Sequence, residues 1–119
     1  MSATYNWCQD KTRLAIWGKP VFFDTRLGDK YWFLNGKRHR VDGPAIEYAS
    51  GDKYWYFNGK WHRVDGPAVE CANGSKWWYL DGKLHRENGP AIEYADGDKY
   101  WYLNGKRYSE SDYWEEVKK

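Results

Sequence analysis

Short stretches in which apolar and polar residues alternate recur at a fixed interval along most of this chain. From Gly28 the sequence reads GDKYWFLNGKRHRVDGPAIEYAS, and similar 23-residue segments begin at Gly51, Gly74 and Gly97. Alternation over a few residues rich in Tyr, Trp, Phe, Val and Ile is typical of β-strands. Repetition at a fixed period indicates an array of equivalent structural units. The pattern therefore predicts an all-β repeat protein.

Two series of turn dipeptides divide every unit into hairpins. Asn-Gly and Asp-Gly accept the positive φ angles of a type I′ turn, which is the strongest short signal for a β-hairpin. We therefore expect an elongated, twisted sheet built from successive antiparallel hairpins. The first series lies at 35–36, 58–59, 81–82 and 104–105, and the second at 50–51, 73–74 and 96–97.

The two ends of the chain depart from the repeat. Residues 20–24 echo residues 44–47 with a register slip, which predicts a degenerate cap, as terminal repeats usually are. Near the other end, Ser109 and Asp112 match a capping box, and the following residues have helical spacing, so we expect a short helix that covers the open end of the sheet. The expected single domain comprises an N-terminal cap (1–27), hairpin repeats (28–50, 51–73, 74–96 and 97–108) and a C-terminal helix (109–119).

The turns also predict which residues lie opposite one another. If each dipeptide is a two-residue loop, Tyr56 faces Trp61 across the first turn and Ile46 faces Trp55 across the second. Directly opposed residues share a face of the sheet. One face is then expected to be the core, built from Trp, Leu or Phe, and Ile or Val columns. These columns contain Trp32, Trp55, Trp78 and Trp101, then Leu34, Phe57, Leu80 and Leu103, and Ile46 with Val69.

The same register gives the opposite face a different chemistry. Glu47, Tyr54 and Arg63 would form one rung, in which cross-strand ion pairing combines with a cation–π contact. Tyrosine columns run beside this rung, so this face is expected to be half-exposed. Between units, Asp42-Gly43-Pro44 and its equivalents should bend or break the sheet, because Pro cannot donate to the strand ladder and Gly favours bulges.

Composition supports a folded protein and excludes a polybasic one. The 119 residues include nine Trp, eleven Tyr and four Phe, and the formal net charge is only +2. Disordered chains are poor in aromatic residues, which supply the apolar area that offsets chain entropy. Charged residues interrupt the first 23 residues, so no secretory leader or membrane span is expected. With only Cys8 and Cys71, we expect reduced thiols in a cytoplasm.

The repeated sequence motif resembles those of known classes of repeat protein. A 23-residue aromatic and glycine-rich hairpin unit is similar to MORN-type repeats. A more specific motif resembles tandem repeats in uncharacterised proteins of bacteriophages and large DNA viruses. This motif is Lys-Tyr-Trp-Tyr-Leu-Asn-Gly-Lys, followed by His-Arg-x-Asp-Gly-Pro-Ala. This resemblance covers Pro20 to about Arg107. It implies a small phage accessory protein that binds and inhibits a host or defence protein in a bacterial cytoplasm.

No residue pattern in the chain predicts catalysis, a metal or a cofactor. His39, His62 and His85 form a column, but equivalent residues of neighbouring hairpins are two strands apart, about 9.6 Å, which is too far for one zinc ion. The repeated Asp and Glu residues have nearly equal surroundings, whereas an acid and a base need different ones. Nucleophile elbows and phosphate-binding loops are missing from the sequence. We therefore predict that the protein is not an enzyme.

Two binding functions remain. Lys-Arg-His-Arg at 37–40 and related basic clusters follow the first turn of each unit and lie beside aromatic columns, which suits single-stranded nucleic acid or a nucleotide. Protein binding fits better, because Tyr, Trp and Arg are enriched at interaction hot spots. Homodimerisation through the same aromatic face is compatible with this pattern. The predicted partner-binding residues are Tyr54, Tyr56, Trp61, Arg63, Trp77, Tyr79 and Arg86.

Overall fold

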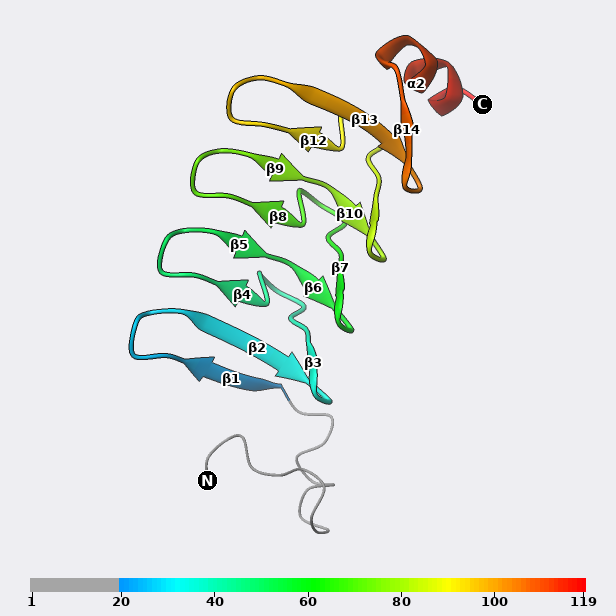
Figure 1. Ribbon diagram of the computed structural model, residues 1–119. Coiled ribbons are helices and arrows are strands. Elements are labelled where there is room, and N and C mark those ends of the chain that lie inside the picture. The colour runs from blue at the N-terminus through cyan, green and yellow to red at the C-terminus, as the bar shows by residue number, and fades with distance from the viewer. Residues whose placement is uncertain (1–19) are drawn as a thin grey trace.

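Each repeat folds into two hairpins that share one strand. The computed structural model describes residues 20–119, and the chain rises through the array unit by unit from β1 to α2 (Figure 1). The array measures 56 × 32 × 18 Å, so it is elongated and thin.

Most strands are short because the central strand is interrupted at Trp55 and Trp78 in the second and third units, and an Asp-Gly-Pro or Asn-Gly-Pro segment interrupts each of the first three units. Their bounds are β1 (Val21–Asp24), β2 (Lys30–Leu34), β3 (Lys37–Arg38), β4 (Ile46–Glu47), β5 (Lys53–Tyr54), β6 (Tyr56–Phe57), β7 (Lys60–Trp61), β8 (Val69–Glu70), β9 (Lys76–Trp77), β10 (Tyr79–Leu80), β11 (Lys83–Leu84), β12 (Ile92–Glu93), β13 (Lys99–Leu103) and β14 (Lys106–Tyr108); the helix is α2 (Glu110–Val117).

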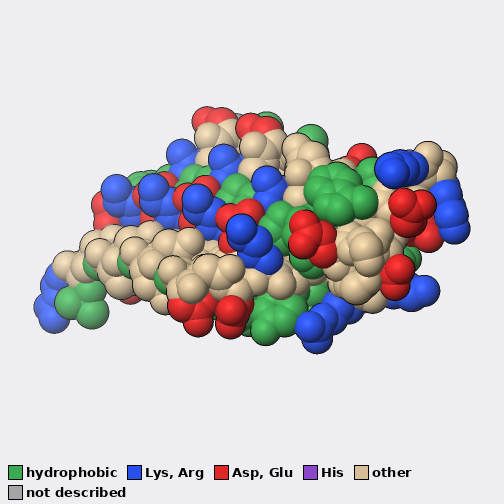
Figure 2. Space-filling model, turned by 90° about the horizontal axis from the view of Figure 1, so that it is seen from above, with side chains coloured by type: hydrophobic (Ala, Val, Ile, Leu, Met, Phe, Trp, Pro, Cys, Tyr) green, Lys and Arg blue, Asp and Glu red, His purple; other side chains and the backbone are tan. Residues whose placement is uncertain are grey.

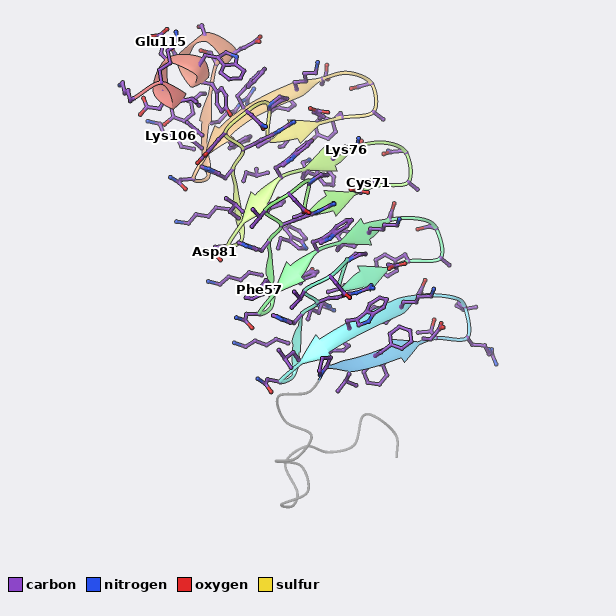
Figure 3. The ribbon with its side chains drawn as sticks, turned by 180° about the vertical axis from the view of Figure 1, so that it is seen from behind. Phe57, Cys71, Lys76, Asp81, Lys106 and Glu115 are labelled. Carbon is purple, nitrogen blue, oxygen red and sulfur yellow. The ribbon has the colours of Figure 1, made fainter. Side chains whose placement is uncertain are left out.

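One sheet crosses all the units, and shorter hairpins project from it. The sheet has the order β1-β2-β4-β5-β8-β9-β12-β13-β14, with β3 paired to β2, while β6-β7 and β10-β11 form separate pairs. All of these pairs are antiparallel. Figure 3 places Phe57 and Asp81 along the edge made by the projecting hairpins, and Cys71 and Lys76 in the wide part of the sheet. The predicted all-β array of hairpins with a short C-terminal helix is confirmed.

The first series of turns has the predicted geometry. Asn58 and Gly59 have φ angles of 51° and 81°, and the other three pairs of this series are alike. Both central residues of a type I′ turn have positive φ, which Asn and Gly tolerate better than other residues. As a two-residue loop requires, Tyr56 pairs with Trp61.

The second series of turns differs from the prediction by one residue. The Tyr48 N–H donates to the Asp52 carbonyl and the Gly51 N–H to the Tyr48 carbonyl, both at 2.9 Å. The loop therefore has three residues, and Gly51, with φ of 104°, is the left-handed residue that closes it. As a result, Ile46 pairs with Tyr54, and the predicted pairing of Ile46 with Trp55 is wrong.

This shift moves the core. A slip of one residue transfers a side chain to the other face of a strand. Ile46 and its equivalents therefore lie on the same face as the tyrosine columns, and Phe57, predicted as core, is 43% exposed. Ala45, Ala68 and Ala91 are buried on the opposite face, directly before the buried residues Ile46, Val69 and Ile92.

Hydrogen bonds from histidine join each unit to the next. The Nδ1 atoms of His39, His62 and His85 each accept a backbone N–H at 2.9 Å, from Asn58, Asp81 and Asn104 respectively. The donor is in each case the first residue of the next type I′ turn. The histidine column thus fixes the spacing of the projecting hairpins.

Both ends of the described array are closed by atypical elements. β1 pairs with β2 so that Phe23 is opposite Tyr31, which gives Phe23 the place that Ile46 has beside Tyr54. At the other end, the Ser109 hydroxyl accepts the Asp112 N–H at 3.2 Å and begins α2, as predicted. Residues 1–19 of the expected N-terminal cap lie outside the described residues, as does Cys8.

We predict that the bond to His39 makes stability depend on pH. Burial lowers the pKa of His39 below its ordinary value of about 6.5. The unfolded chain therefore takes up this proton first as the pH falls. The stability that neutral His39 contributes is fully present above about pH 6.5 and is lost as the pH falls through the folded-state pKa.

Urea denaturation of the parent and of the His39→Gln variant measures this effect. At about pH 7.5 the variant should be less stable by about 1 kcal/mol, the usual contribution of a hydrogen bond. The difference should shrink at about pH 5, where His39 stabilises the fold less. An equal difference at both pH values would contradict the role given to the neutral imidazole.

Candidate functional site

The alternation of side chains gives the sheet two chemically different faces. Tyr54, Val69 and Trp77 are aligned across three neighbouring strands, so they share a face. The tyrosine face, as we name it, is the side that contains Tyr54, Tyr56, Trp61, Trp77 and Tyr79. The arginine face is the opposite side, which contains Arg40, Arg63 and Arg86 with Trp32, Trp55 and Trp78.

Five of the seven predicted partner-binding residues come together on the tyrosine face. Trp61 lies at the centre of this group. Its ring is stacked at 6.4 Å from Tyr54 with an interplanar angle of 17°, and tilted at 6.1 Å from Tyr56. It also lies 4.8 Å from Tyr79 of the next unit. All four rings are half-buried, so their remaining surface faces outward.

The tyrosine hydroxyls of this group can form hydrogen bonds with a partner. Burial raises the pKa of the Tyr54 and Tyr79 hydroxyls, so both stay neutral and can donate as well as accept near pH 7. Among residues 20–119, the buried Nε1 of Trp61 has no hydrogen-bond partner. Because buried N–H groups are usually paired, this donor distinguishes Trp61 from its neighbours.

A second row of rings extends the face toward the other side of the sheet. Tyr48 contacts Tyr54 edge-on at 5.6 Å, and Tyr94 contacts Trp77 edge-on at 6.0 Å. Between these two pairs the equivalent position is Cys71, whose thiol pKa is raised by burial. Because cysteine is smaller than tyrosine and not aromatic, Cys71 interrupts the row of rings at the middle unit.

The predicted set of partner-binding residues omitted two cationic residues of this face. The Arg38 guanidinium lies 5.6 Å from the ring centre of Tyr56, and that of Arg107 lies 4.5 Å from Tyr100. Position 38 is equivalent to Trp61, Leu84 and Arg107 in the repeat. Aligning this column with the type I′ register would have placed both arginines beside the tyrosines.

Arg63 and Arg86 lie on the arginine face, so the predicted rung of Glu47, Tyr54 and Arg63 is wrong. The Arg63 guanidinium is 3.8 Å from the ring centre of Trp55. Its Nε donates to Asp65 at 3.0 Å, and one terminal nitrogen donates to the Pro67 carbonyl at 3.1 Å and to Glu70 at 2.8 Å. All of these Arg63 hydrogen bonds are made to groups of the chain itself, so they stabilise its own fold.

The same network recurs in the units on either side. Arg40 lies over Trp32 at 3.7 Å and Arg86 over Trp78 at 3.8 Å. Arg40 binds Asp42, the Pro44 carbonyl and Glu47, while Arg86 binds Asn88, the Pro90 carbonyl and Glu93, all at 2.9–3.1 Å. The side chains of Arg40, Arg63 and Arg86 are only 21–22% exposed.

This network explains the glycine that precedes each proline. A Cβ atom at Gly66 would lie 2.8 Å from the Arg63 Cζ atom, and the distances at Gly43 and Gly89 are 2.9 Å. The glycine is therefore needed for space and not for an unusual φ angle. The loop breaks the strand, as predicted, and it also wraps around the arginine.

The rest of the arginine face is close to neutral. Lysines and glutamates alternate across the sheet, for example Lys30 opposite Glu47 and Lys53 opposite Glu70. Rows of basic side chains with acidic ones beside them are visible along the array in Figure 2. Part of the positive charge of the predicted basic clusters is therefore paired with acidic side chains of the chain itself and is not available to an external partner.

Residues 20–119 hold no group of three or more His, Cys, Asp or Glu side chains arranged to bind a metal ion. Within the same range, the protein contains no helix with the length and apolar character needed to span a membrane. Compared with known proteins, the chain matches no family model, no curated protein and no solved structure.

We predict that Gly66 is required only because Arg63 is present. Gly66→Ala should cost about 2 kcal/mol of unfolding free energy, because the new methyl group displaces a guanidinium that makes several charge-assisted hydrogen bonds. In an Arg63→Ala background the same change should cost almost nothing. A double-mutant cycle followed by urea denaturation measures the coupling between the two positions. Equal costs in both backgrounds would contradict this account of the loop.

Proposed function

We propose that this chain is a non-enzymatic protein-binding module whose tyrosine face contacts the partner. The observation that carries the proposal is the packing of Tyr54, Tyr56 and Tyr79 around Trp61. Trp and Tyr are the residues that most often dominate binding energy at protein interfaces. Here they are half-buried, so each ring is held in place while part of its surface remains open.

The repeat architecture supports this function by limiting the entropic cost of binding. The rings are attached to paired strands, and backbone bonds join neighbouring units, as from the Arg63 N–H to the Tyr79 carbonyl at 3.1 Å. A side chain that is already fixed loses little freedom when a partner docks. Tyr also has few rotatable bonds for its contact area.

The resemblance of the repeats to proteins of bacteriophages and large DNA viruses supports a bacterial host or defence protein as the partner, bound and inhibited in the cytoplasm. The inhibition proposed is occlusion, because the tyrosine face offers a broad surface for contact. A second copy of the chain on the same face is the competing protein partner, and it would give a homodimer.

Single-stranded nucleic acid is a second candidate because Arg38 and Arg107 lie beside rings of the tyrosine face. Bases stack on aromatic rings, and arginine binds phosphate. Three other arginines, Arg40, Arg63 and Arg86, are paired with protein groups, which limits the phosphate contacts available. An affinity for oligonucleotides that falls steeply with salt would favour this alternative.

We predict that Tyr56→Ala/Tyr79→Ala abolishes partner binding. The tagged chain is used to capture proteins from nuclease-treated bacterial lysate, and the affinity of the purified partner is then measured by calorimetry. Loss of two hot-spot tyrosines should weaken binding by at least about 100-fold.

Leu27→Ala is the matched control, since Leu27 is 77% exposed in the turn between β1 and β2. The control should bind like the parent, and thermal unfolding checks that both variants are folded. Undiminished binding by the folded tyrosine variant would contradict an interface on the tyrosine face.

A further inference from the structure

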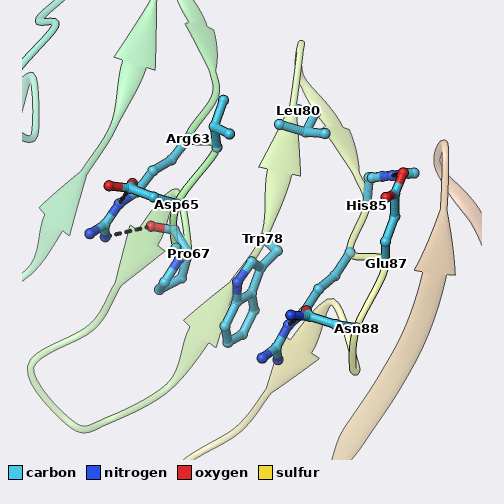
Figure 4. A pocket seen from close by; sticks show the side chains of 11 residues that line it. Arg63, Asp65, Pro67, Trp78, Leu80, His85, Glu87 and Asn88 are labelled. Carbon is cyan, nitrogen blue, oxygen red and sulfur yellow. Dashed lines mark hydrogen bonds and ion pairs between the residues drawn. The ribbon is translucent and has the colours of Figure 1, made fainter.

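The arginine face is hollowed between successive units. One hollow, of about 630 Å³, lies between the loop of Arg40–Pro44 and Trp55 of the next unit. The other, of about 870 Å³, lies between the loop of Arg63–Pro67 and Trp78. Figure 4 shows Trp78 between this loop and the segment that carries His85 and Glu87. Equivalent residues line both hollows, because the units repeat.

At the third equivalent position the chain's own helix fills the place beside Trp101, and a hollow of about 670 Å³ remains between His85, Leu103 and Val117. Tyr113 of α2 is completely buried, and its ring lies 5.0 Å from Trp101, the counterpart of Trp55 and Trp78. Its hydroxyl donates to the Arg86 carbonyl and accepts the Gly89 N–H at 3.3 Å. The helix thus presents one phenol side chain to the loop of the third unit.

A difference in sequence explains why the helix occupies only this position. Ser109 stands where the preceding units have Arg40, Arg63 and Arg86, so no arginine of the repeat series covers Trp101. Tyr113 and Trp114 pack against Trp101 instead. In the two preceding units an arginine covers part of the tryptophan, yet Trp55 and Trp78 still line their hollows.

The two open hollows retain the groups that hold the Tyr113 hydroxyl. Gly66 and Arg63 line one hollow, and Gly43 and Arg40 line the other. In residues 20–119 no hydroxyl group bonds to the N–H of Gly43 or Gly66, whereas Gly89 is bonded and buried. Val41 and Val64, both more than 80% exposed, provide an apolar rim beside these groups.

We propose that the two open hollows bind tyrosine side chains of a helical segment of a partner protein. The phenol hydroxyl would lie between the glycine N–H and the arginine carbonyl of the loop, as the hydroxyl of Tyr113 does. Equivalent sites are two strands apart, about 9.6 Å. Seven residues of an α-helix advance about 10.5 Å, so tyrosines seven residues apart on one helix reach both hollows. The sites are separate from the tyrosine face.

Nuclear magnetic resonance of the ¹⁵N-labelled full chain tests this proposal. The probe is a peptide with the sequence of residues 109–118, blocked at both ends and added at millimolar concentration, where a small docked segment can be detected. We expect saturable shifts of the Gly43 and Gly66 amide signals and no shift of Gly89, whose partner Tyr113 is already in place. A version of the peptide carrying Tyr113→Phe should bind several-fold more weakly, because it cannot bond to the glycine N–H.

Two results would overturn the proposal. The first is that Gly43 and Gly66 shift no more than Gly89, and the second is that only Gly89 shifts, which would mean exchange with α2. The same titration on the Tyr56→Ala/Tyr79→Ala variant separates this site from the tyrosine face. Unchanged shifts at Gly43 and Gly66 support the hollows, whereas their loss would assign the peptide to the tyrosine face.

Discussion

The stacking of an arginine on a tryptophan is the interaction on which the other features of this array depend. A sheet with a single layer has no second layer to bury its side chains, so each face must be covered by its own residues. On one face Arg63 covers Trp55, and its bonds to Asp65, the Pro67 carbonyl and Glu70 hold the loop that carries the chain into the next unit. Without that loop the strands of neighbouring units would lose their common register.

The covering of one face by arginine leaves the aromatic residues of the other face for recognition. The arginine face satisfies its charges internally, through ion pairs and alternating lysine and glutamate rows. Among residues 20–119, the tyrosine face has no such network of ion pairs around Trp61, and its rings contact mainly one another. The buried hydrophobic residues of the sheet are aliphatic, namely Ala45, Ile46 and their equivalents. The large aromatic rings therefore lie nearer the surface.

Much of this fold could be predicted because its local signals are strong. Asn58-Gly59 admits only a tight hairpin, and Ser109 with Asp112 marks a helix start. Ser50-Gly51 resembles the same signal but ends a three-residue loop, and a dipeptide alone does not distinguish the two. That one-residue error put Ile46 on the wrong face. Arg63 was misplaced for another reason: β7 ends at Trp61 and the Arg63 N–H bonds to the Tyr79 carbonyl of the next unit, so Arg63 does not continue the pairing with Tyr54. Trp61 and its neighbours were placed together correctly, because their register depends on the other turn.

The side-chain bonds between units have a consequence for how the protein is made. The Asp29 carboxylate accepts the Ala49 N–H, Asp52 accepts that of Ala72, and the Ser75 hydroxyl accepts that of Ala95, so each such contact spans 20 residues. Contacts that are close in sequence form quickly, and a repeat array can extend from any unit that is already folded. Each hairpin can therefore add to the one before it as the ribosome releases it, and α2 is the last element to close the structure.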